Sequence, residues 1–233
     1  MSTPHTHLLA LHGWAGDQRS WQPWAELAQQ RDWSFSAAER GYGQLPPHQP
    51  SWEPGASARV VLAHSLGPHL LPEDLWQQAT AVVLLASFGA FVPPGPAGRP
   101  VKAALRAMAQ RLTPAEQQAM LREFFATAAA PAPPSRLPPG PLEQGIDEAG
   151  RARLLADLAL LGRCCGLPAG FPQGVPVLIV EADDDQIVPA ASRQLLRESL
   201  PQATVWRLEP AGHALLLNDL PERVITWIAD GCR

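Results

Sequence analysis

The chain has 233 residues, of which 46% are hydrophobic and 17% charged, and its formal net charge at pH 7 is −4. This length is enough for one α/β domain with a sizeable core, and a negative balance without basic clusters excludes nucleic acid as an expected partner. The sequence contains neither an apolar run of membrane-spanning length nor a basic N-terminal segment followed by an apolar stretch. We therefore expect residues 1–233 to form a single cytoplasmic domain, a monomer that does not bind a membrane.

Short apolar runs that recur along the chain predict the strands of a sheet. They lie near residues 6–11, 59–64, 81–86, 175–181 and 203–208, with a weaker candidate at 33–37. Segments of helical character separate them. Such alternation is typical of an α/β protein with a parallel sheet that is covered by helices on both faces.

The run over residues 59–64 leads directly into a serine flanked by small residues. Ala63 stands two positions before Ser65, and Gly67 stands two positions after it. A sharp strand-to-helix turn needs small residues there because its backbones nearly touch, and the turn pushes the serine Oγ out of the sheet edge. The pattern predicts Ser65 as a nucleophile. An ordinary strand that ends in a Ser-Leu-Gly turn is the alternative.

An activated serine needs a histidine base and a carboxylate that orients the base, and both follow downstream. The run 175–181 leads into three consecutive aspartates, Asp183 to Asp185, and the run 203–208 leads into His213. Both segments follow the C-terminal ends of predicted strands, where open parallel sheets place their active sites. A solvated acidic turn and a structural loop histidine are the alternatives, but the order serine, aspartate, histidine favours a catalytic set.

The oxyanion that forms when a serine attacks an ester requires two preorganised N–H donors. One is the backbone amide of Leu66, directly after the serine. The second is expected from the loop after the first strand, where His12-Gly13-Trp14 lets the amide of Trp14 face the nucleophile. His12 is predicted to hold this loop in place and not to take part in the chemistry.

The region between the third and fourth strong runs changes to helical segments separated by prolines. Helices are predicted over 100–111, 114–128 and 147–162. Thr113 followed by Pro114 and Glu116 is typical of a helix start. An insertion of this kind, about residues 90–170, predicts a helical cap over the active site. Disorder is the alternative for the proline-rich residues 131–141.

Four of these motifs together resemble the α/β-hydrolase superfamily. They are His12-Gly13-Trp14, Ala63-His64-Ser65-Leu66-Gly67, Asp185-Gln186-Ile187-Val188-Pro189 and Gly212-His213-Ala214. Within that superfamily the chain is most similar, over nearly its whole length, to the pimeloyl-[acyl-carrier protein] methyl ester carboxylesterases of biotin synthesis.

The resemblance implies an α/β-hydrolase fold and a register for the acid. Asp185 is implied as the triad acid because it stands four residues before Pro189. The strand before the His-Gly-Trp motif opens the chain, so the small antiparallel pair that usually precedes it in the superfamily is missing. The expected sheet is therefore mainly parallel, with about six strands.

The resemblance also implies residues that hold the substrate, besides Trp14 and Leu66. In these esterases a phenylalanine-led cap segment lines the acyl channel, and Phe124-Phe125-Ala126-Thr127-Ala128 falls at that place. The family's segment ends in a longer polar side chain where this chain has Ala128. The family also uses cap arginines to hold the acidic carrier protein, which makes Arg122 and Arg136 candidates for carrier docking.

Sequence and resemblance together predict a serine carboxylesterase that works through an acyl-serine and requires no metal or cofactor. The expected substrate and partner is an acyl-carrier protein bearing a dicarboxylate methyl ester, the pimeloyl ester of biotin biosynthesis. A thioesterase or a menaquinone-pathway-type lyase would use the same triad, and a non-catalytic hydrolase-fold binding protein is a further alternative. Cys164, Cys165 and Cys232 fit neither a disulfide framework nor a metal-ligand spacing and are predicted to be reduced thiols.

Overall fold

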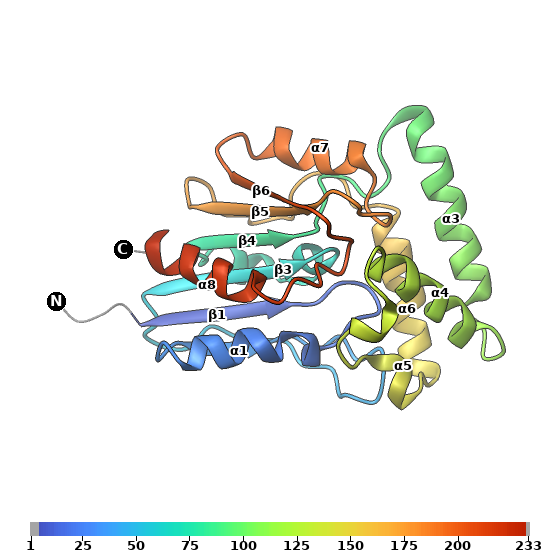
Figure 1. Cartoon of the computed structure of the whole chain (residues 1–233), viewed down its shortest axis with the longest axis horizontal. Helices are drawn as coiled ribbons and strands as arrows, with labels where there is room; N and C mark the ends of the chain where they lie inside the picture. The colour runs from blue at the N-terminus through green and yellow to red at the C-terminus, as the bar shows by residue number, and fades with distance from the viewer. Residues whose placement is uncertain (1–4, 232–233) are drawn as a thin grey trace.

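The computed structural model describes residues 5–231, and its six strands form one sheet (Figure 1). The strand order is β2-β1-β3-β4-β5-β6, and every neighbouring pair in the described residues is parallel. The strands are β1 (Thr6–Leu11), β2 (Ser34–Ala37), β3 (Ala58–His64), β4 (Ala81–Leu85), β5 (Val177–Ala182) and β6 (Thr204–Leu208). The predicted α/β fold with a six-stranded parallel sheet is confirmed.

Helices fill the connections between these strands. The α-helices are α1 (Gln22–Gln29), α2 (Glu73–Trp76), α3 (Gly98–Arg111), α4 (Gln117–Ala129), α5 (Pro141–Gln144), α6 (Glu148–Leu161), α7 (Ala190–Ser199) and α8 (Leu220–Gly231). The 3₁₀ helices are η1 (Gln18–Trp21), η2 (Gly67–Leu70), η3 (Gly95–Ala97) and η4 (Pro134–Arg136). Within the described residues, no helix combines the length and the apolarity that a membrane span needs.

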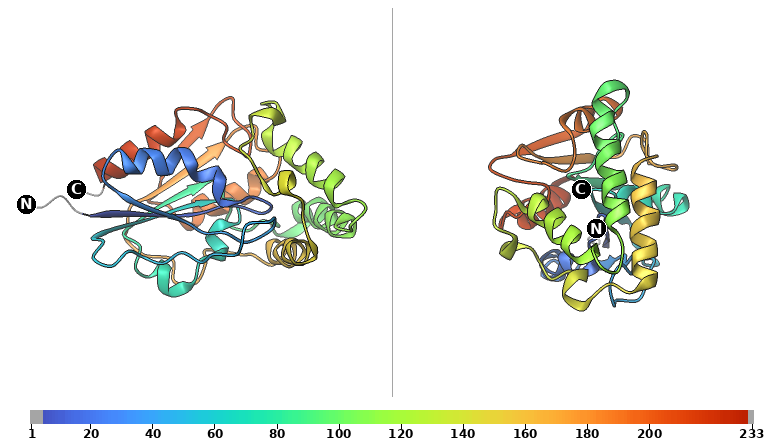
Figure 2. Two further views of the ribbon diagram at one scale, coloured as in Figure 1. Left: turned by 90° about the horizontal axis from the view of Figure 1, so that it is seen from below. Right: turned by 90° about the vertical axis from the view of Figure 1, so that its right-hand side faces the viewer.

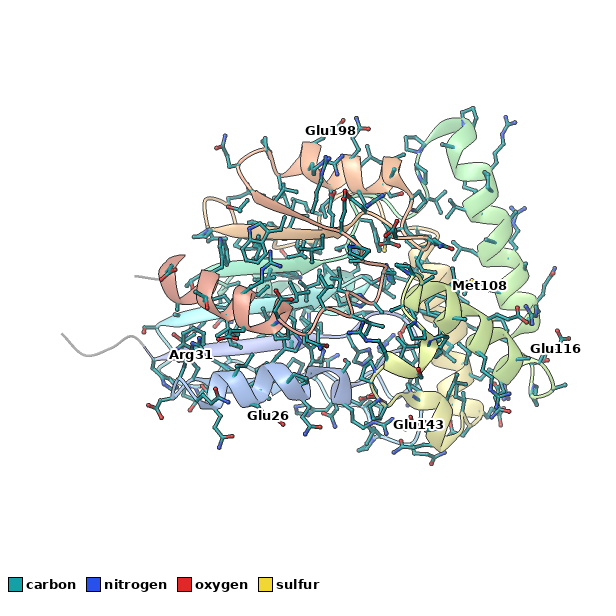
Figure 3. The ribbon with its side chains drawn as sticks, in the orientation of Figure 1. Glu26, Arg31, Met108, Glu116, Glu143 and Glu198 are labelled. Atoms are coloured by element: carbon teal, nitrogen blue, oxygen red, sulfur yellow. The ribbon has the colours of Figure 1, made fainter. Side chains whose placement is uncertain are left out.

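Alternate side chains of the strands point to opposite faces of the sheet, and each face has its own apolar core. On one face the strand core packs against α1 and α8, which Figure 2 shows on the same side of the sheet. On the other face it packs against Trp76 of α2 and Leu196 of α7. Glu26 of α1 and Glu198 of α7 point away from these layers in Figure 3.

The elements η3 to α6, residues 95–161, form a helical cap between β4 and β5 in the chain. Figure 1 shows this cap at the end of the sheet toward which the strands point. Its core includes Leu121 of α4 and Leu154 of α6, which pack in one cluster with Trp14 and Leu66 from the sheet edge. Because open parallel sheets bind ligands at this edge, the cap covers the place where a site is expected.

Helix α4 begins three residues later than the sequence predicts. The side chain of Thr113 does accept a hydrogen bond from the N–H of Glu116, at 3.2 Å. The carbonyl of Thr113 accepts from the N–H groups of both Glu116 and Gln117, so residues 113–116 close a separate turn before the regular helix. The proline-rich residues 131–141 contain η4 and the first residue of α5.

Two of the predicted thiols lie in the described part of the chain. Cys164 is buried and Cys165 exposed, and both are free. Burial raises the pKa of the Cys164 thiol to about 11, which makes it a poor nucleophile at neutral pH. Cys232 lies outside the described residues.

A buried carboxylate fastens the cap to the loop after β2. Asp157 of α6 is 2% exposed, and its two oxygens accept from Nε and Nη2 of Arg40 at 2.6 and 2.7 Å. The hydroxyl of Tyr42 donates to the same carboxylate at 2.6 Å. Burial, with the Asp157 charge, raises the pKa of the Tyr42 phenol well above its ordinary value, so the hydroxyl remains a donor.

Asp157→Ala should therefore destabilise the protein. The change leaves the Tyr42 hydroxyl and one side of Arg40 without an acceptor, and because Arg40 is partly exposed we expect a cost of about 2–3 kcal/mol. Thermal unfolding followed by circular dichroism should show a midpoint lower by roughly 5–10 °C. Glu148→Ala, an exposed acidic position on the same helix, is the matched control and should cost less than about 1 kcal/mol. Equal midpoints for the two variants would contradict the role of Asp157.

Candidate active site

Ser65 follows β3 directly and holds a strained backbone conformation. Its φ is 54°, in the left-handed region that non-glycine residues rarely adopt. Two hydrogen bonds fix it there: its N–H donates to the carbonyl of Leu85 at 2.9 Å, and its carbonyl accepts from the hydroxyl of Ser87 at 2.9 Å. The end of β4 therefore supports the turn that lifts the serine out of the sheet edge.

Two glycines allow neighbouring backbones to approach this turn. A Cβ on Gly67 would lie 2.6 Å from the carbonyl oxygen of Leu11, and a Cβ on Gly13 would lie 2.9 Å from the Cβ of Ser65. Either contact would force the backbone to shift. The close approach that the sequence pattern predicts around Ser65 is thus present, on both the β1 side and the side of the His-Gly-Trp loop.

The helix expected after the turn is short. It is the 3₁₀ helix η2, and it ends because Leu71 is extended, with φ −86° and ψ 132°. A residue before proline is driven out of the helical region by the proline ring, and Pro72 follows Leu71.

Ser65, His213 and Asp185 form one line of hydrogen bonds. Nε2 of His213 lies 3.0 Å from Oγ of Ser65, and Nδ1 of His213 lies 2.9 Å from Oδ2 of Asp185. With its proton on Nδ1, the imidazole donates to the carboxylate and leaves Nε2 free to accept the serine proton. Ser65 and His213 are only 5% and 3% exposed. The structure therefore brings together the three residues predicted as a triad.

Among the three consecutive aspartates, only Asp185 lies against His213. Its other oxygen, Oδ1, accepts the backbone N–H groups of Ile187 and Val188 at 2.8 and 2.9 Å. Burial by itself raises the pKa of this carboxyl, but the nearby His213 and the hydrogen bonds from His213, Val188 and Ile187 outweigh it and hold the pKa below its ordinary value. Asp183 and Asp184 are exposed.

The predicted oxyanion amides belong to residues next to the serine: Leu66 follows Ser65 in the chain, and Trp14 follows Gly13, whose backbone lies close to the Cβ of Ser65. The N–H groups of Trp14 and Leu66 donate no hydrogen bond to another group of the described residues. The indole N–H of Trp14 donates to the carbonyl of Leu154 at 2.9 Å, which anchors the side chain to α6. Leu66 itself is fully buried, so its contribution to a substrate would come from its backbone N–H alone.

His12 braces the loop that carries Trp14. Its Nδ1 donates to the carbonyl of Gly13 at 2.9 Å, and its Nε2 accepts the N–H of Arg40 at 3.2 Å. Burial lowers the pKa of this imidazole, so it is neutral at pH 7. The contacts agree with the structural role predicted for His12.

His64 is a site residue that the sequence analysis did not single out. Its Nε2 donates to the backbone carbonyl of His213 at 2.9 Å, and the two rings lie 5.0 Å apart. Burial and the neighbouring His213 lower the pKa of His64 to about 4, so it is neutral where esterases work. The only sequence signal was its place next to the candidate nucleophile.

A cavity of about 490 Å³ opens over this line of hydrogen bonds. Apart from Ser65, His64 and His213, it is lined mainly by apolar side chains from four places: the loop that carries Trp14, the start of α1, the cap, and the segment after His213. The last of these, residues 214–221, contains the apolar run Leu215-Leu216-Leu217, which the sequence analysis also passed over. An apolar cavity of this kind suits an acyl chain.

The cap segment predicted to hold substrate contributes three of its five residues. Phe124, Phe125 and Ala128 line the cavity, whereas Ala126 and Thr127 do not. Successive residues of a helix are about 100° apart, so residues 124, 128 and 125 span one arc of about 100° and residues 126 and 127 lie outside it. The Thr127 hydroxyl accordingly donates to the carbonyl of Glu123 on its own helix, at 3.0 Å.

The two candidate carrier-docking arginines differ in position. Arg122 is exposed on α4 and does not line the cavity. Arg136 lines it, and its Nη2 donates to the carbonyl of Leu216 at 2.8 Å and to Oδ1 of Asn218 at 3.1 Å. Together with the bond from the N–H of Ala214 to the carbonyl of Ala128, this ties the cap to the segment after His213.

Solved structures with the same fold include several esterases. An esterase from Exiguobacterium antarcticum is 16% identical, with a TM-score of 0.73 over 96% of this chain and 92% of its own. A thermophilic esterase from Thermogutta terrifontis is 15% identical, with a TM-score of 0.68 over 97% and 90%. A 2-hydroxy-6-oxo-6-phenylhexa-2,4-dienoate hydrolase from Rhodococcus is 19% identical, with a TM-score of 0.69 over 97% and 91%. At these identities the likeness establishes the fold.

Sequence comparison gives the family. A comparison with curated protein sequences finds no match. The Alpha/beta hydrolase family matches residues 5–227, nearly the whole chain. This chain therefore belongs to the α/β-hydrolase family.

Proposed function

We propose that this protein is a serine carboxylesterase with Ser65 as nucleophile, His213 as base and Asp185 as the acid that orients it. The observation that carries the proposal is the unbroken line of hydrogen bonds from Asp185 through His213 to Ser65 at the floor of an apolar cavity. A non-catalytic binding protein would have no need of a strained serine whose Oγ lies within hydrogen-bond distance of a histidine.

The proposed reaction has two halves. His213 takes the Ser65 proton through Nε2 as Oγ attacks the ester carbonyl, and the amides of Trp14 and Leu66 hold the oxyanion. The imidazolium gives its proton to the departing alcohol, which leaves an acyl-serine. Water that donates a proton to His213 then attacks the acyl group, and Ser65 regains its proton as the free acid leaves. Asp185 stabilises the charged imidazole in both halves.

For the substrate we propose the methyl ester of pimeloyl-acyl-carrier protein in biotin synthesis. The apolar lining of the cavity and the resemblance of the four motifs support this choice. A free carboxylate at the end of the chain would be costly to bury during elongation, so an ester masks it until an esterase removes the methyl group.

Two assays test the proposal at two levels. Hydrolysis of a short-chain nitrophenyl ester by the purified protein tests esterase activity, and its absence would favour a binding protein. Rescue of a biotin auxotroph that lacks its own esterase tests the substrate. Esterase activity without rescue would reject the biotin role and leave another ester, a thioester or a carbon–carbon lyase reaction at the same triad.

If Arg122 and Arg136 dock a carrier protein, their replacement should affect a carrier-bound ester more than a small ester. Arg122→Glu combined with Arg136→Glu should lower kcat/KM for the carrier-bound ester more than for a small neutral ester, because only the carrier presents an acidic surface. The difference should be largest at low ionic strength, where charge steering is strongest. Stopped assays with both substrates at two salt concentrations measure it. Equal losses on both substrates would mean that the arginines support the structure of the cap.

A further inference from the structure

The cavity runs from a buried floor to an exposed mouth. Ser65 and His213 form the floor. Of the residues that line it, four are exposed and therefore mark where the cavity meets solvent: Pro23, Arg136, Pro138 and Asn218. An acyl chain whose ester lies at Ser65 would extend past apolar walls toward this mouth.

Arg136 is the one charged group at the mouth. Among the lining residues that the structure describes, it is the only arginine, lysine, aspartate or glutamate. The carbonyl of Leu216 and the side chain of Asn218 hold its Nη2. Within residues 5–231 no carboxylate lies within 4.0 Å of it. A guanidinium has five N–H donors, so most of its hydrogen-bonding capacity is unused.

The apolar walls and Arg136 together indicate what kind of ligand would fit the cavity. Apolar walls accept a methylene chain, and a fixed guanidinium accepts an anionic oxygen group, either a carboxylate or a phosphate, often through two parallel hydrogen bonds. Unlike most surface arginines, this one is already oriented by two hydrogen bonds, so less side-chain entropy is lost when an anion binds.

We propose that Arg136 is a specificity-determining residue that binds an anionic group at the end of the substrate remote from the scissile ester. The preferred substrates are then esters of chains with a distal negative charge, and neutral esters of the same length are poorer. The inference rests on the proposed esterase function and adds to it an anion subsite on the enzyme itself, separate from any docking of a carrier protein.

Two matched pairs of esters test this at low ionic strength. The first pair is monomethyl and dimethyl pimelate, which differ in one carboxylate. The second is methyl pimeloyl-phosphopantetheine and its dephosphorylated form, which differ in one phosphate. In the pair whose anion matches that of the natural substrate, the wild-type kcat/KM per ester group should be higher for the charged ester by on the order of tenfold. Arg136→Gln should bring that ratio close to one, and Arg136→Lys should retain part of it.

A ratio within each pair cancels any general damage to the cap, because a loosened cap slows both members equally. Arg106→Gln, at an exposed arginine of α3 that does not line the cavity, is the matched control and should keep the wild-type ratio. If Arg136→Gln loses the preference for the charged ester in the carboxylate pair or in the phosphate pair, the result supports the subsite and shows which anion it binds. Ratios that are unchanged by Arg136→Gln in both pairs overturn it, while hydrolysis of all four esters still supports the proposed function. Hydrolysis of none of them, nor of a nitrophenyl ester, would overturn both.

Discussion

Ser65→Ala should abolish ester hydrolysis while the protein stays folded. Without Oγ there is no acyl-serine, and triads of this kind lose about 10⁴-fold or more in kcat when the nucleophile is removed. Alanine has a Cβ like serine, so it fits the φ of 54° no worse, and the two backbone hydrogen bonds to Leu85 and Ser87 remain possible. Turnover of a nitrophenyl ester measures the loss, and circular dichroism checks the fold.

A covalent label sharpens this test. A fluorophosphonate should add one group per wild-type chain, at Ser65, and none to Ser65→Ala. Ser199→Ala, an exposed serine on α7, is the matched control and should be labelled and active like the wild type. If purified Ser65→Ala keeps more than a small fraction of wild-type turnover, another residue is the nucleophile.

The sheet could be predicted from the sequence because its central strands β1, β3, β4 and β5 are buried almost throughout and are therefore short apolar runs. Even the weak candidate at residues 33–37 proved to be β2. Helix ends were less predictable because they depend on which backbone N–H and C=O groups pair in the terminal turn. Thr113 capped a turn and not the helix itself, and Pro72 cut short the helix after Ser65.

The triad could be predicted because each member follows a strand end, and parallel strands bring those ends together. The surroundings of the triad depend on the packing of distant segments, which no local pattern records. The bond from His64 to the carbonyl of His213 spans 149 positions, and the link from Arg136 to Leu216 spans 80. The cap helix was predicted, but the face that it turns to the cavity was not, and Thr127 points elsewhere.

The second large loss of activity is expected in the loop of three aspartates before Pro189. Asp185→Asn should lower kcat by about 10³–10⁴-fold, because a neutral amide neither stabilises the imidazolium nor enforces the proton on Nδ1 of His213. The Asn side-chain oxygen can still accept the N–H groups of Ile187 and Val188, so the loop should keep its shape.

Asp183→Asn and Asp184→Asn are matched controls in the same loop. Both residues are exposed, and their changes should alter kcat by no more than a few-fold. Nitrophenyl ester kinetics on the three variants decide the assignment: a larger loss at Asp183 or Asp184 than at Asp185 would mean that the acid of the triad has been placed on the wrong residue.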